Sequence, residues 1–400
     1  MRETYIYDAV RTPRGKGKDG GSLTGVAPAE LVRQLVQALE SRQGAGVRDI
    51  DHLTLGCVGQ IGAQGGHIGL VSRLHSGLPE TATVWTLNNY CVSGLSAAMS
   101  GADKIAAGSA DFVMAGGVES MSQVPFMADR ASYYTDPEFS ASLRYLPVVL
   151  SADVLAQRED VSRETLDEIA LVSHQRAARA QTENIAQQSL VPVQDAAGNV
   201  LLARDEYVRG NISREALAAF EPAFAALSSI YAPVLKATLG LDAVDHRHTV
   251  THAPGIADGA GLAILGTRDA GEARGLKPRA HIVARSEAAG DPVLSLTSGR
   301  VAMERALAKA GLTLADMDVI EYMEAFAVVP ALFYRDYKVD RDKVNITGGH
   351  VAKGHPLGAS GAILLSTLLD VMDERDAEYG LLVAHAASGI GSAVILRRER

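Results

Sequence analysis

The chain has 400 residues, of which 47% are hydrophobic and 21% are charged. This length exceeds that of one average core, so we expect two or three domains in a soluble globular protein. The net charge of −9 argues against a general nucleic-acid binder, which needs a broad basic face. With only two cysteines, Cys57 and Cys91, a disulfide scaffold is excluded and a reducing compartment is favoured.

Residues 1–10 carry charges and have the pattern of a strand rather than of a signal peptide. The sequence contains no uncharged apolar run of about 18 residues, the length that a membrane span requires. We therefore expect a cytoplasmic protein without a membrane span.

The first 120 residues alternate between strand and helix patterns. Apolar residues at positions 31, 32, 35, 36 and 39 share one helical face, which predicts a helix over 29–41. A second helix, rich in small residues, is predicted over 93–107. Strands are predicted at 5–10, 52–56, 83–88 and 112–115, the last stopped by Gly116 and Gly117.

Residues 121–250 mix polar helices with irregular stretches. The clearest helix is predicted over 162–182, with Ser162 as a possible N-cap and Glu164 close behind it. This segment interrupts the alternating pattern, which indicates an inserted domain.

Strand and helix patterns resume after residue 250. Strands are predicted at 261–266, 281–286, 319–321, 381–384 and 393–397, and helices at 297–310 and 359–373. The order of helix, strand and glycine turn that follows Cys91 recurs after His355, which indicates one α/β unit used twice. The predicted fold class is therefore α/β, with two pseudo-symmetric halves. The predicted domains are 1–120 together with 251–272, an inserted loop domain at 121–250, and a second half at 273–400.

Cys91 is the first candidate for chemistry because it lies between a predicted strand and a predicted helix. Unpaired N–H groups and the dipole at a helix N-terminus stabilise a thiolate. A small buried hydrophobe is an equally good interpretation of a lone cysteine. Cys57 has no comparable setting and is interpreted as structural.

Three further residues are candidates for a functional site. His355 lies in a glycine-dense segment, 348–361, where backbone approaches a ligand closely and a histidine serves as base or oxyanion donor. His385 follows a predicted strand end, the place where α/β folds bind ligands. Glu324, in an apolar stretch, needs a partner, so a structural hydrogen bond is as good an interpretation as catalysis. The glycine pairs match no dinucleotide or P-loop fingerprint, and no metal site is predicted.

Seven segments in this order together resemble the thiolase family over nearly the whole chain. They are 8–13 (DAVRTP), 88–94 (NNYCVSG), 116–122 (GGVESMS), 254–260 (PGIADGA), 324–327 (EAFA), 354–361 (GHPLGASG) and the closing glycine turn at 386–391.

The resemblance implies two similar α/β halves with a loop domain, assembled as a homodimer or homotetramer. It implies coenzyme A and acyl-CoA as substrates, with no permanently bound cofactor. Cys91 would carry the acyl group and His355 would activate it, as an imidazolium that lowers the pKa of the thiol. The backbone N–H groups of Cys91 and Ala387, in the turn that contains Gly389, would form an oxyanion hole.

The sequence departs from the family pattern at two catalytic positions. His385 stands where a second catalytic cysteine is usual, so we expect His385 to be the second acid or base; a space-filling role is the alternative. Met323 stands where an asparagine usually holds a water. Met323, Pro254 and Arg209 are expected to contact substrate. Residues 225–244 form an unusually apolar segment of the loop domain, expected either to shape the acyl pocket or to contact another subunit.

The predicted function is thiolytic cleavage of a 3-oxoacyl-CoA, or the reverse Claisen condensation, through an acyl-enzyme on Cys91. One alternative is a decarboxylating condensing enzyme similar to ketoacyl synthases. The other is a protein that binds acyl-CoA without turnover. Acyl-chain length, direction and pathway are not predicted.

Overall fold

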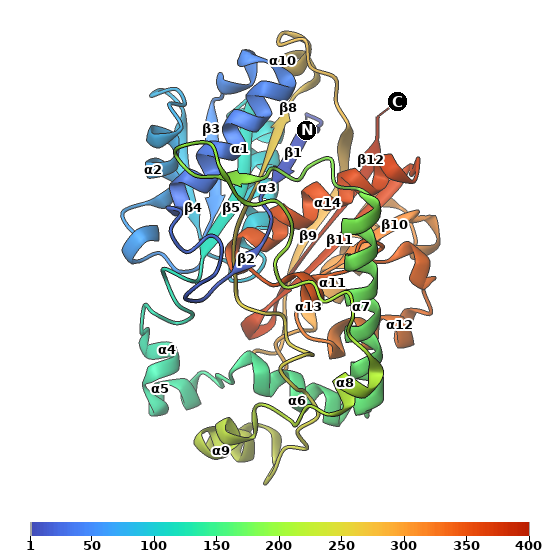
Figure 1. Ribbon diagram of the computed structural model, residues 1–400. Helices are drawn as coiled ribbons and strands as arrows, with labels where there is room; N and C mark the ends of the chain where they lie inside the picture. The colour runs from blue at the N-terminus through green and yellow to red at the C-terminus, as the bar shows by residue number, and fades with distance from the viewer. Residues whose placement is uncertain (1, 400) are drawn as a thin grey trace.

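The computed structural model describes residues 2–399. One mixed sheet organises the chain, and β1 lies in its middle although β1 begins the chain (Figure 1). The strands, in their order across the sheet, are β10 (Val319–Tyr322), β11 (Tyr379–Ala386), β12 (Ile390–Arg398), β9 (Ala280–Ala289), β1 (Tyr5–Arg11), β8 (Ala257–Gly266), β5 (Phe112–Ser120), β3 (His52–Gly56) and β4 (Thr83–Leu87). The short β2 (Gly15–Lys16) pairs onto β8.

The two parts of this sheet share one connection pattern. In the first part, β5 runs parallel to β3 and antiparallel to β8, which pairs with β1. In the second part, β11 runs parallel to β10 and antiparallel to β12, which pairs with β9. The repeated unit predicted from the sequence is therefore present as repeated topology, and the parts meet where β1 pairs with β9. The exact domain boundaries at residues 120, 250 and 272 remain predictions.

Two central helices, α3 (Ser93–Ala107) and α14 (Ser360–Glu374), pack on one face of the sheet and against each other. Successive residues of β8 point to opposite faces, as the strand period of two requires. Ala263 and Leu265 belong to the core beneath α3 and α14. Leu262 and Ile264 belong to the core beneath α1 (Pro28–Gln43) on the other face.

The central helices approach each other closely because each has a glycine at the contact. A Cβ atom on Gly361 would lie 2.4 Å from the backbone nitrogen of Leu95, and one on Gly94 would lie 2.8 Å from the backbone nitrogen of Ala362. No real side chain tolerates such distances to backbone atoms. The glycines therefore bring together the N-terminal ends of the two helices, and with them the segments of Cys91 and His355.

The outer face carries further helices of the two halves. Helix α1 confirms the predicted helix over 29–41, with the predicted apolar face buried. Helices α2 (Ile68–His75) and α10 (Arg268–Glu272) complete the first half, and α11 (Ser298–Ala310) and α12 (Val328–Tyr337) belong to the second. Within residues 2–399, none of the helices has both the length and the apolar character that crossing a membrane demands.

Residues 121–250, which we call the middle segment, form a layer below the sheet in Figure 1. Helix α7 of this segment extends along one side of the sheet. Its helices are α4 (Ser132–Thr135), α5 (Pro137–Ser142), α6 (Val148–Arg158), α7 (Arg163–Glu183), α8 (Arg214–Ala218) and α9 (Ala225–Leu239). It also contains the two-stranded ribbon of β6 (Val193–Gln194) and β7 (Val200–Leu202). Ser162 caps α7 as predicted, its side chain accepting a hydrogen bond from the Thr165 N–H.

One predicted strand end is wrong. Gly116 and Gly117 do not stop β5, which continues to Ser120. Both glycines instead provide room for neighbouring backbone: a Cβ atom on Gly116 would lie 2.0 Å from the Gly261 oxygen, and one on Gly117 would lie 2.2 Å from the Gly358 oxygen. The extension carries Glu119 to the end of the strand.

Candidate active site

Cys91 lies in a tight turn between β4 and α3. Tyr90, the residue before it, has a φ of 49°, in the left-handed region that non-glycine residues rarely occupy. Side chains hold this turn: Asn88 Oδ1 accepts a hydrogen bond from the Tyr90 N–H at 2.9 Å, and Ser93 Oγ accepts one from the Asn89 N–H at 2.8 Å. The turn therefore fixes the thiol directly ahead of the first turn of α3.

A polar network anchors the same turn to the second half of the sheet. Asn89 Nδ2 donates to Ser96 Oγ at 2.9 Å and to Glu287 Oε1 at 3.2 Å. Ser96 Oγ and, at 3.3 Å, Ser392 Oγ also donate to Glu287 Oε1. Because Glu287 lies on β9, residues from both halves determine where Cys91 lies.

The Cys91 thiol is partly buried and faces two backbone N–H groups, those of Ala387 and of Cys91 itself. Burial raises the pKa of the thiol to about 12, and the charge of Glu119 adds to the rise. The two N–H groups lower the pKa and offset part of the rise. Cys91 is therefore a neutral thiol in the free protein at neutral pH.

His355 lies in the turn between α13 (His350–Lys353) and α14. Its Nδ1 atom lies 2.7 Å from Ser360 Oγ, whereas its buried Nε2 atom has no hydrogen-bond partner within residues 2–399. Burial, reinforced by the positive charge of Arg14, lowers the pKa of His355 to about 3. The imidazole is neutral, so the predicted imidazolium that lowers the pKa of Cys91 is wrong for the free protein.

Cys91 and His355 line one cavity of about 400 Å³. The predicted residues Ala387 and Pro254 line it as well. Its lining residues, all in the described part of the chain, include no lysine or arginine. Aromatic rings form much of its wall: Tyr90, Phe126, Tyr133, Tyr134, Tyr145, Phe224 and Phe326. The cavity thus joins a thiol, a neutral imidazole and a largely apolar, aromatic wall.

Comparison with known proteins matches both parts of the chain. Residues 4–234 match the model of the thiolase N-terminal domain, and residues 276–398 match that of the thiolase C-terminal domain. The chain belongs to the thiolase family. This thiolase is 33% identical over 409 residues to the steroid 3-ketoacyl-CoA thiolase of Mycobacterium tuberculosis, covering 100% of this chain and 95% of that relative. It is also 33% identical over 420 residues to the β-ketoadipyl-CoA thiolase of Escherichia coli, covering 100% of both chains.

The fold comparison agrees. The crystal structure of human mitochondrial 3-ketoacyl-CoA thiolase superposes with a TM-score of 0.86 at 28% identity, covering 100% of this chain and 99% of that one. The predicted family and fold class are confirmed. This thiolase is an acyl-CoA C-acyltransferase, as predicted, and neither the decarboxylating alternative nor the non-catalytic one is favoured.

The structure does not bring His385 to the cavity of this thiolase. Its ring is fully buried and lies 4.8 Å from the ring of Tyr322, and a Cβ atom on Gly299 would lie 2.5 Å from it. The neighbouring strand residues Ala384 and Ala386 belong to the core beneath α3 and α14, so His385 points to the opposite face. This geometry gives no support to His385 as the second acid or base.

Four other predicted residues lie outside the residues that line the cavity. Met323 is buried in the core beneath the central helices, and Arg209 is exposed. Gly389 lies in the closing turn with a φ of 75°, where its N-terminal neighbours Ala387 and Ser388 line the cavity. The Glu324 carboxylate accepts hydrogen bonds from Ser173, Asn345 and Val351, which supports its structural interpretation.

Sequence reasoning missed Glu119, which organises the site. One oxygen, Oε2, accepts hydrogen bonds from the N–H groups of Val58 and Gly358, both at 2.9 Å. The other, Oε1, accepts them from the Gly59 N–H at 2.9 Å and from Gln64 Nε2 at 2.8 Å. The carboxylate therefore ties the end of β5 to the turn that carries His355. An acid in a strand of small and apolar residues was the available signal.

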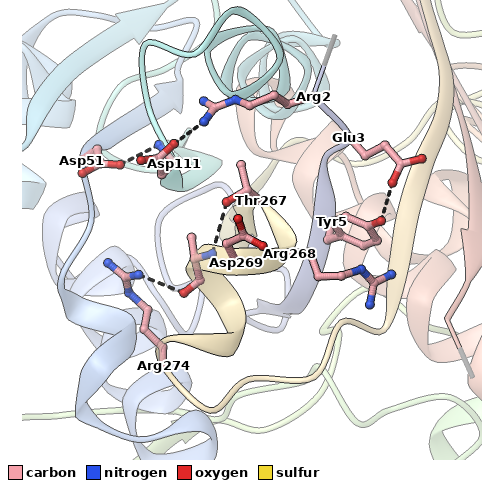
Figure 2. A pocket seen from close by; sticks show the side chains of 10 residues that line it. Arg2, Glu3, Tyr5, Asp51, Asp111, Thr267, Arg268, Asp269 and Arg274 are labelled. Atoms are coloured by element: carbon pink, nitrogen blue, oxygen red, sulfur yellow. Dashed lines mark hydrogen bonds and ion pairs between the residues drawn. The ribbon is translucent and has the colours of Figure 1, made fainter.

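A second depression, of about 630 Å³, lies where β1, α10 and the start of β5 meet (Figure 2). It is polar, and two of its contacts lie between its own lining residues: Arg2 Nη1 forms an ion pair with Asp111 at 2.5 Å, and Tyr5 OH donates a hydrogen bond to Glu3. Its described lining residues include no cysteine or histidine. It lacks the groups for acyl transfer. Within residues 2–399, no cluster of His, Cys, Asp or Glu is arranged to hold a metal ion.

Proposed function

We propose that this thiolase cleaves 3-oxoacyl-CoA with coenzyme A, or runs the reverse condensation, through an acyl-enzyme on Cys91. One observation supports it above the others: the Cys91 sulfur faces two backbone N–H groups, and His355 lines the same cavity. Coenzyme A and acyl-CoA are substrates in this proposal, and no group stays permanently bound.

The proposed acylation begins from two neutral groups. If His355 donates its Nδ1–H to Ser360 Oγ, the lone pair on Nε2 is free to accept the thiol proton. Because the pKa of the thiol is high and that of the imidazole is low, proton transfer accompanies the attack on the carbonyl rather than preceding it. The N–H groups of Cys91 and Ala387 then stabilise the oxyanion.

We further propose that the acyl chain is uncharged and bulky. A chain that ends in a carboxylate would enter the cavity without a lysine or arginine to pair with among its described lining residues, and burying an unpaired charge is costly. The aromatic wall favours flat or ring-containing groups. Helix α9, at the segment predicted to shape the pocket, supports this wall from outside: its Tyr231 ring lies 6.1 Å from the ring of Tyr145.

The assembly and compartment are also proposals. We propose a homodimer or homotetramer in the cytoplasm, in keeping with the low cysteine count. The edge strand β4 and the adjacent α2 support an assembly, because they expose Trp85 at 49% and Leu74 at 56%. Light scattering after size-exclusion chromatography tests this: Trp85→Glu combined with Leu74→Glu should lower the molar mass, and an unchanged mass would place the contact elsewhere.

Mass spectrometry after incubation with acyl-CoA tests the acyl-enzyme. One acyl adduct is expected on the Cys91 peptide, and Cys91→Ala should lose both the adduct and thiolysis. Cys57 is an internal control, since burial beside Glu119 raises the pKa of its thiol strongly. An adduct on Cys57, or turnover by Cys91→Ala, would contradict the proposal.

The proposed acyl-chain preference has its own test. Thiolysis of a 3-oxoacyl-CoA whose chain carries a phenyl group should be faster than thiolysis of one whose chain ends in a carboxylate.

A further inference from the structure

Thiolysis requires a second proton carrier besides His355. Cleavage of the bond between C2 and C3 leaves the bonding electron pair on C2 of the departing acetyl-CoA, and a positioned acid must protonate that carbon. In the reverse direction, a base must remove the same proton. His385 faces away from the cavity, and Cys57 lies outside its lining. The other groups of the cavity wall are therefore the candidates.

Three hydroxyl groups meet in the cavity wall next to Cys91. Tyr133 OH lies 2.9 Å from Ser388 Oγ, and Ser388 Oγ also interacts with the phenol of Tyr90. Tyr90 precedes the nucleophile in sequence, and Ser388 follows Ala387, whose N–H faces the thiol. We call Tyr90, Ser388 and Tyr133 the hydroxyl cluster. The hydroxyl cluster therefore includes a residue from each of the two chain segments next to the thiol: Tyr90 from the segment of Cys91, and Ser388 from the closing turn.

The backbone fixes two members of this cluster in unusual conformations. Tyr90 has a φ of 49° and Ser388 a φ of 57°, both in the left-handed region. The Ser388 N–H donates to Ser295 Oγ at 3.1 Å, which holds the closing turn in place. Backbone strain of this kind persists where surrounding structure enforces it and concentrates at functional sites.

We propose that the Tyr90 phenol is the second catalytic acid and base of this thiolase, and that Ser388, supported by Tyr133, is its positioning residue. This inference rests on the proposed function. The electrostatics agree with it: burial raises the pKa of Tyr90, as do Tyr133, Asp129 and Cys91, whereas the Ser388 hydroxyl lowers it. A phenol that stays protonated at neutral pH is ready to donate to a carbanion.

The proton balance of thiolysis closes with these groups. Cys91 sulfur bonds to C3 while its proton passes to His355. The C2–C3 bond then breaks, C2 takes the Tyr90 proton, and acetyl-CoA leaves behind a phenolate. The thiol of coenzyme A returns a proton to that phenolate as its sulfur attacks the acyl-enzyme. Cys91 sulfur departs and recovers its proton from His355, which restores every group.

Hydrogen exchange at the acetyl methyl group of acetyl-CoA in deuterated water tests the inference, with acyl-enzyme formation on Cys91 measured alongside. Tyr90→Phe should lower exchange by about 10²–10⁴-fold while still forming the acyl-enzyme, because acylation by an acyl-CoA breaks no carbon–carbon bond. Tyr334→Phe is the matched control, since Tyr334 lies on α12 outside the residues that line the cavity, and it should keep the wild-type rate. His385→Phe should keep it as well.

Ser388→Gly tests positioning at a backbone conformation that glycine tolerates. Removing the hydroxyl that lowers the pKa of Tyr90 should shift the rising limb of the exchange–pH profile to higher pH, which a merely structural role would not do. Wild-type exchange in Tyr90→Phe, or loss of exchange in His385→Phe alone, would overturn the inference. So would a wild-type protein that acylates Cys91 without exchange. If no acyl-enzyme forms at all, the proposed function fails first.

Discussion

The Nδ1 atom of His355 lies 2.7 Å from Oγ of Ser360, the first residue of α14. This contact fixes one ring nitrogen, whereas the buried Nε2 atom has no hydrogen-bond partner in the described part of the chain and keeps its lone pair or proton for the reaction. Ser360→Ala should therefore slow single-turnover acylation of Cys91 about tenfold, the equivalent of roughly one hydrogen bond. Ser366→Ala is the control, because Ser366 is equally buried on α14 but donates to the Ile363 carbonyl. Equal rates in both variants would show that the contact does not orient His355.

Alkylation of Cys91 by iodoacetamide should report the state of the free thiol. With the pKa of Cys91 raised to about 12, the rate should rise with pH through pH 9 without a plateau. Since the pKa of His355 is lowered to about 3, His355→Ala should leave the shape of this profile unchanged. A plateau near pH 7 that disappears in His355→Ala would instead establish a thiolate–imidazolium pair.

Buried neutral histidines should make this thiolase sensitive to acid. Burial, reinforced by the charge of Arg300, lowers the pKa of His385 to about 3, below the unfolded value of about 6.5. The neutral ring therefore contributes stability fully above pH 6.5, and this contribution is lost as pH falls from 6.5 toward 3. Denaturation at pH 7 and pH 5 should show that His385→Phe loses about 2 kcal/mol less than the wild type over this interval. Identical losses would mean that the ring becomes protonated without opposing the fold.

Glu119→Gln should destabilise the fold and the site together. The amide nitrogen would face backbone or side-chain N–H groups that now donate to a carboxylate oxygen, so the free energy of unfolding should fall by about 2–4 kcal/mol. Acylation should also slow, because the Gly358 N–H anchors the turn of His355. Glu40→Gln is the control: its ion pair with Arg48 is at the surface, where loss should cost less than about 1 kcal/mol. Chemical denaturation of the two variants separates these outcomes.

The helices and the principal site pair were predictable because their signals are local. The apolar face of α1 follows from spacing alone, and Cys91 and His355 each lie in a turn that leads into a helix, with glycines nearby in the sequence. The orientation of His385 was not predictable, because it depends on where β11 ends. A strand that stops at Ala384 leaves His385 in a loop, whereas the observed strand continues to Ala386, and its pleat turns His385 toward Tyr322.

The aromatic wall was missed for a different reason. Tyr133, Tyr134 and Tyr145 come from short helices and loops between β5 and α6, where no periodicity reports which side faces a cavity. Their positions follow from packing of the middle segment against the sheet. Such contacts join residues far apart in sequence, as Tyr133 and Ser388 show.

The central place of β1 has a consequence for synthesis of the chain. All seven of its residues are buried, and it pairs with β8 and β9, which begin at Ala257 and Ala280. At ~5–20 residues per second, a ribosome needs roughly ten to fifty seconds to deliver these partners after β1 emerges. During that time the nascent chain cannot complete its first half, however well the local helices form. The strand that leaves the ribosome first is therefore among the last to find its place, and chaperones have a long interval in which to bind it.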